Sequence, residues 1–260
     1  IIFVQQLSPV LMVLPALWMK KRIKKPIVSW VLDLWPESLV ATTPIKKGFV
    51  VKLLESFVQK FYKTSDVILI SSQYFKKSIL SKTPEVESRI KYFPNWAEDN
   101  IALNDKRIDL SNIEFPKGYN VMFAGNVGDT QDFESILKAA ELSINAGINW
   151  LIVGDGRKLA WVKEEVKARN ITNVYLLGRH PLEAMPSFFE KADAMLVSLK
   201  NEPIYAMTVP AKVQAYMSCG KVIFGMLNGE GNELINKSNI GVAVAAEDYR
   251  QLVTAIEKVK

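Results

Sequence analysis

A repeated alternation of short apolar runs and longer amphipathic segments most constrains the fold of this chain. After residue 118, six apolar runs each precede a segment with helical spacing or a helix start signal. Strands separated by helices become parallel neighbours, and such strands are apolar along their whole length because both faces are covered. The alternation therefore predicts a doubly wound α/β domain. We expect its strands at Tyr119–Phe123, Asn149–Val153, Val174–Leu177, Ala194–Leu199, Val222–Gly225 and Val242–Ala245.

The first hundred residues show the same alternation with fewer strands. A polar, proline-containing stretch separates them from the second series and is typical of a linker. We therefore predict a partial N-terminal domain at 1–100, a linker at 101–118 and a C-terminal domain at 119–260. Because the chain opens on a strand, we expect the first domain to be incomplete at its N-terminus. Its strands are predicted at Ile1–Gln6, Ile27–Asp33, Val67–Ile70 and Arg89–Phe93, and its helices at Lys47–Thr64 and Gln73–Ser81.

Composition narrows the classes of function. One cysteine, Cys219, excludes a disulfide framework, and one histidine, His180, argues against a histidine-rich metal site. The net charge of +6 lies in the first hundred residues, which hold 15 Lys and Arg against 8 Asp and Glu. That excess favours an anionic neighbour such as membrane phospholipid, a lipid diphosphate or nucleic acid, or it is a solvated charged face. Prolines and glutamines interrupt Ile1–Met19, so we interpret it as strand, turn and helix rather than a signal anchor.

In doubly wound sheets, ligands bind at the loops that follow the carboxyl ends of the strands. The first such loop of the second domain holds Gly125, Asn126 and Gly128, and Gln131 begins the next helix. Glycines let backbone N–H groups approach an anion, and a helix N-terminus favours negative charge. The loop therefore predicts a phosphate site, with a plain capped turn as the alternative. We interpret Gly154-Asp155-Gly156, after the next strand, as turn chemistry alone.

Two basic residues stand near these loops. Lys212 falls in the first turn of a helix that starts near Pro210, where a cation opposes the helix dipole unless an anion is also bound. Such a conflict with a local rule is typical of a functional site, and an exposed lysine is the alternative. Arg179 follows the third strand and can contact phosphate or a nucleobase, while His180 is more often a surface residue.

In the first domain, the segment from Leu32 to Ser38 ends an apolar strand with two carboxylates and a tryptophan. Asp33 and Glu37 are therefore candidate catalytic groups that orient or deprotonate a sugar hydroxyl, and Trp35 can cover a sugar face. Alternatively, Asp33 caps the following turn and Trp35 is a core residue.

Together these segments resemble the retaining glycosyltransferases of family 4, which have the two-domain GT-B architecture of Rossmann-like domains. The similarity is to O-antigen and capsule L-fucosamine or N-acetylhexosaminyl transferases. It covers nearly the whole chain. The motifs that carry it are LDLWPES at 32–38, FPNW at 93–96, FAGNVGDTQDFESILKAAE at 123–141, LIVGDG at 151–156, ADAMLVSL at 192–199 and VPAKVQAYMSCGKVI at 209–223.

The resemblance implies a nucleotide-diphosphate sugar, usually a UDP-sugar, bound by the second domain without a metal. It also implies a lipid-linked saccharide acceptor against the first domain, at the cytoplasmic face of the membrane, and no nucleic acid partner. On that basis Gly125, Asn126 and Lys212 are expected diphosphate contacts, with Arg179 near the base. Glu230 and Glu233 fall in the segment GEGNELI, which resembles the donor side.

The chain also departs from the family pattern. Many relatives carry Arg and Lys where this chain has Asn126 and Gln131, so Lys212 is expected to supply the missing charge. The family's paired glutamates fall on Met207 and Ala215, which leaves the activity of this chain open. Two other functions stay open: a UDP-sugar 2-epimerase of the same architecture, and a non-catalytic sugar-nucleotide-binding partner subunit.

Overall fold

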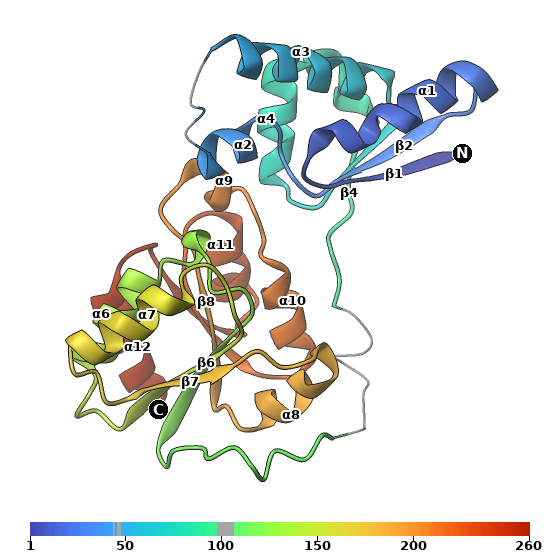
Figure 1. Cartoon of the computed structure of the whole chain (residues 1–260). Coiled ribbons are helices and arrows are strands. Elements are labelled where there is room, and N and C mark those ends of the chain that lie inside the picture. The colour runs from blue at the N-terminus through green and yellow to red at the C-terminus, as the bar shows by residue number, and fades with distance from the viewer. Residues whose placement is uncertain (44, 46–47, 98–106) are drawn as a thin grey trace. The chain divides into compact units, whose positions relative to one another are not determined.

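The computed structural model describes residues 1–43, 45, 48–97 and 107–260, which form two compact units. The first unit comprises Ile1–Asn95 together with Glu202–Val209. The second comprises Trp96–Asn201 together with Pro210–Lys260. Figure 1 labels helices and strands of both.

This division differs from the predicted domain boundaries in two ways: the second unit begins at Trp96, ahead of the predicted linker, and one segment changes unit. Glu202–Val209 lies between two elements of the second unit in sequence but packs with the first unit. Its helix α9 (Pro203–Ala206) contacts α2 (Glu37–Thr42), and its Ile204 belongs to the first unit's core. The Ser72 hydroxyl also donates to the carbonyl of Met207. The sequence does not predict that this segment belongs to the first unit, because the apolar residues of Pro203–Ala206 are equally suited to the core of either unit. Residues 101–106 of the predicted linker lie outside the described residues.

The first unit is a parallel sheet of four strands in the order β1-β2-β3-β4. Helix α3 places Val58, Phe61 and Tyr62 in its core, because these positions share one face of the helix. The strands are β1 (Ile2–Gln6), β2 (Ile27–Val31), β3 (Val67–Ile70) and β4 (Ile90–Tyr92), and the longer helices are α1 (Leu14–Ile23), α3 (Phe49–Thr64) and α4 (Tyr74–Lys82).

The second unit is a parallel sheet of six strands in the order β10-β9-β8-β5-β6-β7, with helices on both faces (Figure 1). Its strands are β5 (Tyr119–Ala124), β6 (Ile148–Val153), β7 (Val174–Gly178), β8 (Ala194–Ser198), β9 (Val222–Met226) and β10 (Gly241–Val244). Its helices are α6 (Phe133–Leu142), α7 (Leu159–Ala168), α8 (Met185–Glu190), α10 (Ala211–Ser218), α11 (Glu230–Lys237) and α12 (Tyr249–Val259).

The strand order reverses between β5 and β8. These two strands pair only at Val121 with Ala194 and at Met122 with Met195. β5 stays paired with β6 as far as Ala124. The sheet therefore opens on the β8 side of β5 toward the carboxyl ends, which is the place where doubly wound sheets bind ligands.

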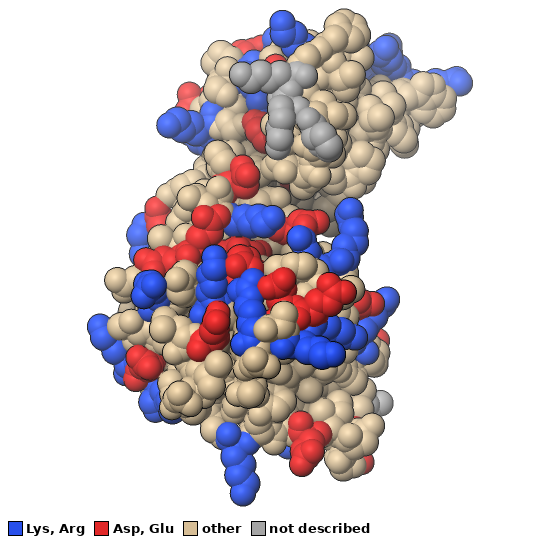
Figure 2. Space-filling model, turned by 60° about the vertical axis from the view of Figure 1, so that its left-hand side comes forward, with Lys and Arg blue, Asp and Glu red and all other residues tan. Residues whose placement is uncertain are grey.

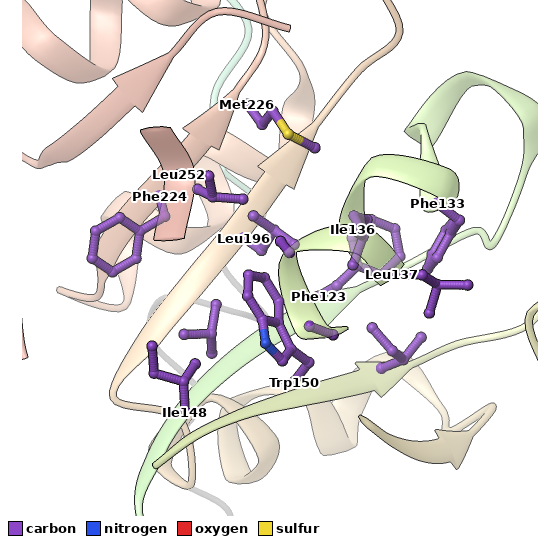
Figure 3. Close-up of a cluster of buried hydrophobic side chains, with 14 of the residues drawn as sticks. Phe123, Phe133, Ile136, Leu137, Ile148, Trp150, Leu196, Phe224, Met226 and Leu252 are labelled. Carbon is purple, nitrogen blue, oxygen red and sulfur yellow. The ribbon is translucent and has the colours of Figure 1, made fainter. Parts of the chain in front are cut away.

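The core of the second unit lies between this sheet and helices α6 and α12 (Figure 3). Trp150 of β6 is fully buried, and its indole N–H donates to the Ser143 hydroxyl at 3.0 Å. Leu196 of the central strand β8 is also fully buried. Strands β6 and β8 are buried along their whole length, so both of their faces are covered, as the alternation predicts.

All ten predicted strands are present, mostly within a residue of the predicted bounds, and the predicted doubly wound architecture is confirmed. One boundary bears on the site: β2 ends at Val31, so Asp33 lies in the loop after the strand and not within it. No helix in the described ranges combines the length and the apolar character needed to span a bilayer.

We expect Leu196→Ala to lower the free energy of unfolding by about 2–5 kcal/mol, because it leaves a cavity in the central strand. The matched control is Leu142→Ala at the end of α6, where the leucine is 52% exposed. This control should change stability by about 0.5 kcal/mol or less. Differential scanning calorimetry of both variants measures the difference. Equal losses of unfolding free energy would contradict the assignment of Leu196 to the core and of Leu142 to the surface.

Candidate functional site

The carboxyl ends of β5, β6 and β7 are joined by backbone hydrogen bonds between their loops. Gly125 N–H donates to Val153 at 2.9 Å, and Gly154 N–H donates to Gly178 at 2.7 Å. A Cβ atom at Gly154 would lie 1.9 Å from the carbonyl oxygen of Gly125. Gly154 also has a φ of +141°, which side chains rarely adopt. Only glycine therefore permits this approach of the two loops.

An open cavity of about 890 Å³ lies over these strand ends. That size is within the range of small-molecule sites in proteins. The centre of the His180 ring lies 4.4 Å from the centre of the Phe188 ring, with the two planes tilted by 47°, and its Nε2 lies 2.9 Å from the Leu177 carbonyl oxygen. The cavity is lined by Gly125, Asn126, Val153, Gly154, Asp155, Gly156, Arg179, His180, Pro181, Leu182 and Met185.

Lys212 projects from the first turn of α10 against the start of this loop. A Cβ atom at Gly125 would lie 3.1 Å from its Cε atom, so the lysine stem packs directly on the Gly125 backbone. Its Nζ donates to Gln131 Oε1 at 3.1 Å and sits 3.5 Å from the centre of the Phe123 ring. Lys212 keeps some solvent exposure, but protein atoms surround it almost completely, and this burial lowers its pKa to about 7.

The electrostatics of Lys212 depend on its having no carboxylate partner in the described part of the chain. Its near neighbours are an amide, an aromatic ring and backbone. The ring and the amide oxygen favour the ammonium form weakly, whereas enclosure disfavours it strongly. An anion bound beside Gly125 would supply the missing counter-charge. Lys212 thus lies against the loop that holds Gly125 and Asn126, while their contact with a diphosphate stays a prediction.

The other expected donor-side residues are less closely grouped. Gly128 lines a separate cavity of about 240 Å³ together with Asp129, Asp132, Phe133, Glu134, Lys158, Trp161 and Lys200. Glu230 and Glu233 begin α11, which follows β9, and neither lines the larger cavity. Glu233 forms an ion pair with Lys237 at 2.6 Å. Their roles at a donor site stay predictions.

The interpretation of Gly154-Asp155-Gly156 as a turn alone is incomplete, since all three residues line the cavity. A Cβ atom at Gly156 would lie 2.3 Å from the carbonyl oxygen of Val127, so this second glycine also permits contact with the first loop. The signal was available in the sequence: both loops follow predicted strands, and parallel neighbours bring their carboxyl ends together.

In the first unit, Asp33 lies in the loop after β2 and is partly buried. Its carboxylate accepts hydrogen bonds from the Ser38 hydroxyl and, at 3.3 Å, from the Trp35 indole N–H. Burial raises its pKa above the usual value and outweighs these hydrogen bonds. Such a carboxyl is typical of functional sites, because its environment disfavours the charge it carries at neutral pH.

Glu37, at the start of α2, has a different environment. Its carboxylate accepts from the ammonium of Lys82 and, at 2.6 Å, from the Ser78 hydroxyl. Burial alone would raise its pKa, but the charge and hydrogen bonds of Lys82 outweigh burial and lower it. The structure therefore gives Glu37 the environment of a structural ion pair, and its predicted catalytic role stays untested.

Residues 118–259 match the family described as Glycosyl transferases group 1, which is more than half of the chain. The chain belongs to this family. It is 27% identical over 240 residues to "Probable glycosyltransferase WbjE" of Pseudomonas aeruginosa, covering 89% of this chain and 60% of that protein. It is 24% identical over 221 residues to a protein of Escherichia coli strain K12 named as a colanic acid biosynthesis glycosyl transferase, WcaI, covering 82% of this chain and 54% of that protein.

Among solved structures, the Anabaena protein HepE in complex with UDP and glucose superposes with a TM-score of 0.74. The two sequences are 13% identical, and the match covers 99% of this chain and 67% of that one. The GT-B fold, with two Rossmann-like parallel-sheet domains, is thereby confirmed for this member of the glycosyl transferases. The chain spans 60% and 54% of the length of the two curated relatives above.

The opposite pKa shifts of Asp33 and Glu37 predict opposite effects of neutralising them. When the folded state raises the pKa of a carboxyl, the free energy of unfolding falls as the pH rises from the unfolded-state pKa through the folded-state pKa, because the charged form is disfavoured. Asp33→Asn removes that charge, so it should leave the free energy of unfolding at pH 7 unchanged or increase it. A lowered pKa contributes stability that is lost as the pH falls through it, so Glu37→Gln should cost about 1–3 kcal/mol at pH 7.

Urea unfolding of the two variants at pH 7 and pH 4 measures this difference. The loss in Glu37→Gln should shrink at the lower pH, where the wild-type carboxylate begins to take up its proton. A larger loss from Asp33→Asn than from Glu37→Gln at pH 7 would contradict the assignment of the structural role to Glu37.

Proposed function

We propose that this chain is the nucleotide-sugar-binding part, with a portion of the acceptor-binding part, of a retaining family 4 glycosyltransferase. The donor is a UDP-sugar and the acceptor a lipid-linked saccharide in bacterial surface polysaccharide synthesis. The observation that carries the proposal is the packing of Lys212 on Gly125, at the edge of a cavity lined by strand-end loops. The complex of HepE with UDP and glucose and the colanic acid name of WcaI support the donor and the pathway class.

In such a transfer the leaving group is the nucleoside diphosphate, and the loop that holds Gly125 and Asn126 is proposed to bind it. The bond between the anomeric carbon and the diphosphate oxygen breaks, and negative charge develops on the diphosphate. The backbone N–H of Asn126 and the ammonium of Lys212 stabilise that charge, and the missing side chain at Gly125 lets the diphosphate approach the backbone. Arg179 lines the same cavity, and its proposed role is to contact the nucleoside or a phosphate oxygen.

The acceptor hydroxyl supplies the oxygen that forms the new glycosidic bond, and its proton must leave during the transfer. Asp33 is the proposed group that orients this hydroxyl or accepts its proton, because its raised pKa makes it a stronger base than an exposed aspartate. The metal-free character of the transfer is part of the proposal, since Lys212 provides the positive charge that a divalent cation provides elsewhere.

Peripheral contact with the inner face of the plasma membrane is proposed for the first unit. Helix α1 exposes Leu14, Trp18 and Ile23, and its last turn and C-cap carry Lys21, Arg22 and Lys24. Apolar side chains beside lysine and arginine suit the surface of an anionic bilayer. The second unit lacks this bias: on the face in Figure 2, its basic and acidic side chains are interspersed.

The test is calorimetric titration of the chain with UDP. Replacing Lys212 by Gln removes the charge but keeps a polar side chain, so UDP affinity should fall about 10-fold or more. The matched control is Lys163→Gln on the exposed face of α7, which should bind UDP as the wild type does. Unchanged affinity in Lys212→Gln would refute the donor site proposed above.

The same preparation separates the other two functions. Incubation with UDP-sugars and a lipid-linked acceptor yields a lengthened saccharide for a transferase. An altered sugar nucleotide formed without any acceptor would instead indicate the epimerase, and binding without turnover would indicate the partner subunit. Addition of EDTA should leave UDP binding unchanged if no metal takes part.

A further inference from the structure

Tyr216 of α10 is a fully buried tyrosine with an unusual pair of hydrogen bonds. Its hydroxyl accepts from the backbone N–H of Ala124 and donates to the carbonyl oxygen of the same residue, both at 3.2 Å. Its ring packs edge-on against Phe189 with 5.4 Å between the centres. Burial raises the pKa of the hydroxyl well above its usual value, so the O–H stays available as a donor.

The position of Ala124 explains why a hydroxyl is needed there. Gly125 N–H points to β6, where it donates to Val153. Because backbone groups alternate sides along a strand, the N–H and C=O of Ala124 point toward β8. The pairing of β5 with β8 has already ended at Met122, so Ala124 has no ladder partner on the β8 side. The Tyr216 hydroxyl satisfies both groups, which would otherwise be buried without partners.

Tyr216 is also joined to the candidate donor site through its own helix. It lies four residues after Lys212, so the two side chains occupy the same face of α10. Lys212 packs on Gly125, and Tyr216 bonds to Ala124, the residue directly before it. One helix face thus holds both the cation and the backbone that precedes the loop.

The far end of the loop is held by β8. The Ser198 hydroxyl donates to the carbonyl of Gln131 at 2.6 Å, and Lys200 N–H donates to Thr130 at 3.0 Å. Gln131 in turn accepts from Lys212. The loop is therefore fixed at its end by β8, and at its start by Tyr216.

We propose that Tyr216 is a positioning residue for diphosphate binding: its hydroxyl holds α10 on the open side of β5 and so sets the place of Lys212 relative to the Gly125 backbone and the N–H of Asn126. The inference rests on the proposed function, since it assumes a diphosphate as the ligand. In this proposal the Tyr216 hydroxyl acts through Lys212, and Tyr216 itself contacts no ligand.

The experiment is a double-mutant cycle on the 260-residue chain, with UDP affinity measured by calorimetry. Tyr216→Phe keeps the ring packing and removes the hydroxyl, and it should weaken UDP binding about 5- to 10-fold. In the Lys212→Gln background the same change should weaken binding less than about 2-fold, because the group that Tyr216 positions is gone. Tyr62→Phe, at a buried tyrosine of the first unit, is the control and should leave UDP binding unchanged.

Three results would overturn this inference. An unchanged affinity in Tyr216→Phe, or equal losses in both backgrounds, would show that the hydroxyl does not act through Lys212. A wild-type chain that fails to bind UDP would instead refute the proposed function, and the inference with it.

Hydrogen exchange measured by mass spectrometry gives an independent readout. Removal of the hydroxyl should speed exchange at residues 124–128, while β6 at Ile148–Val153 stays protected. Equal protection of residues 124–128 in wild type and Tyr216→Phe would also contradict the positioning role.

Discussion

The candidate site of the second unit is built around the contact between the Lys212 side chain and the Gly125 backbone. The ammonium group is held against the Gly125 backbone by an amide oxygen and an aromatic ring, and burial brings its pKa down to about 7. A buried cation without a counter-charge costs stability. An anion offsets that cost only if it binds beside the same backbone, which is where the glycine loops leave room.

The fold provides this arrangement through the sheet. Because β5 stays paired with β6, the two glycine loops that follow these strands meet at the carboxyl end of the sheet. Because β5 separates from β8, Tyr216 of α10 can reach the backbone at Ala124. The first unit shows a related conflict at Asp33, whose pKa is raised by burial. Each unit thus contains a charged group in surroundings that disfavour its charge, and such strain is typical of binding and catalytic sites.

Much of this organisation could be predicted from the sequence. Parallel strands covered on both faces are mostly apolar, so their number and their places along the chain follow from the alternation. Lys212 was identifiable because a cation in the first turn of a helix breaks a local rule. Other features depend on contacts between distant segments. Tyr216 has the pattern of any core aromatic, and the pairing of Glu37 with Lys82 joins residues 45 apart. The crossing of Glu202–Val209 into the first unit leaves no periodic trace.

The central claim is that the anion supplies the charge partner that Lys212 lacks, and proton uptake on binding tests it most directly. Calorimetric titration with UDP at pH 8, in buffers of different ionisation enthalpy, gives the number of protons bound with the nucleotide. With a pKa of about 7, Lys212 is mostly neutral at pH 8 before UDP binds and becomes charged beside the diphosphate. We expect uptake of most of one proton by the wild type and none by Lys212→Gln. UDP binding without proton uptake at pH 8, or with equal uptake in both proteins, would contradict it.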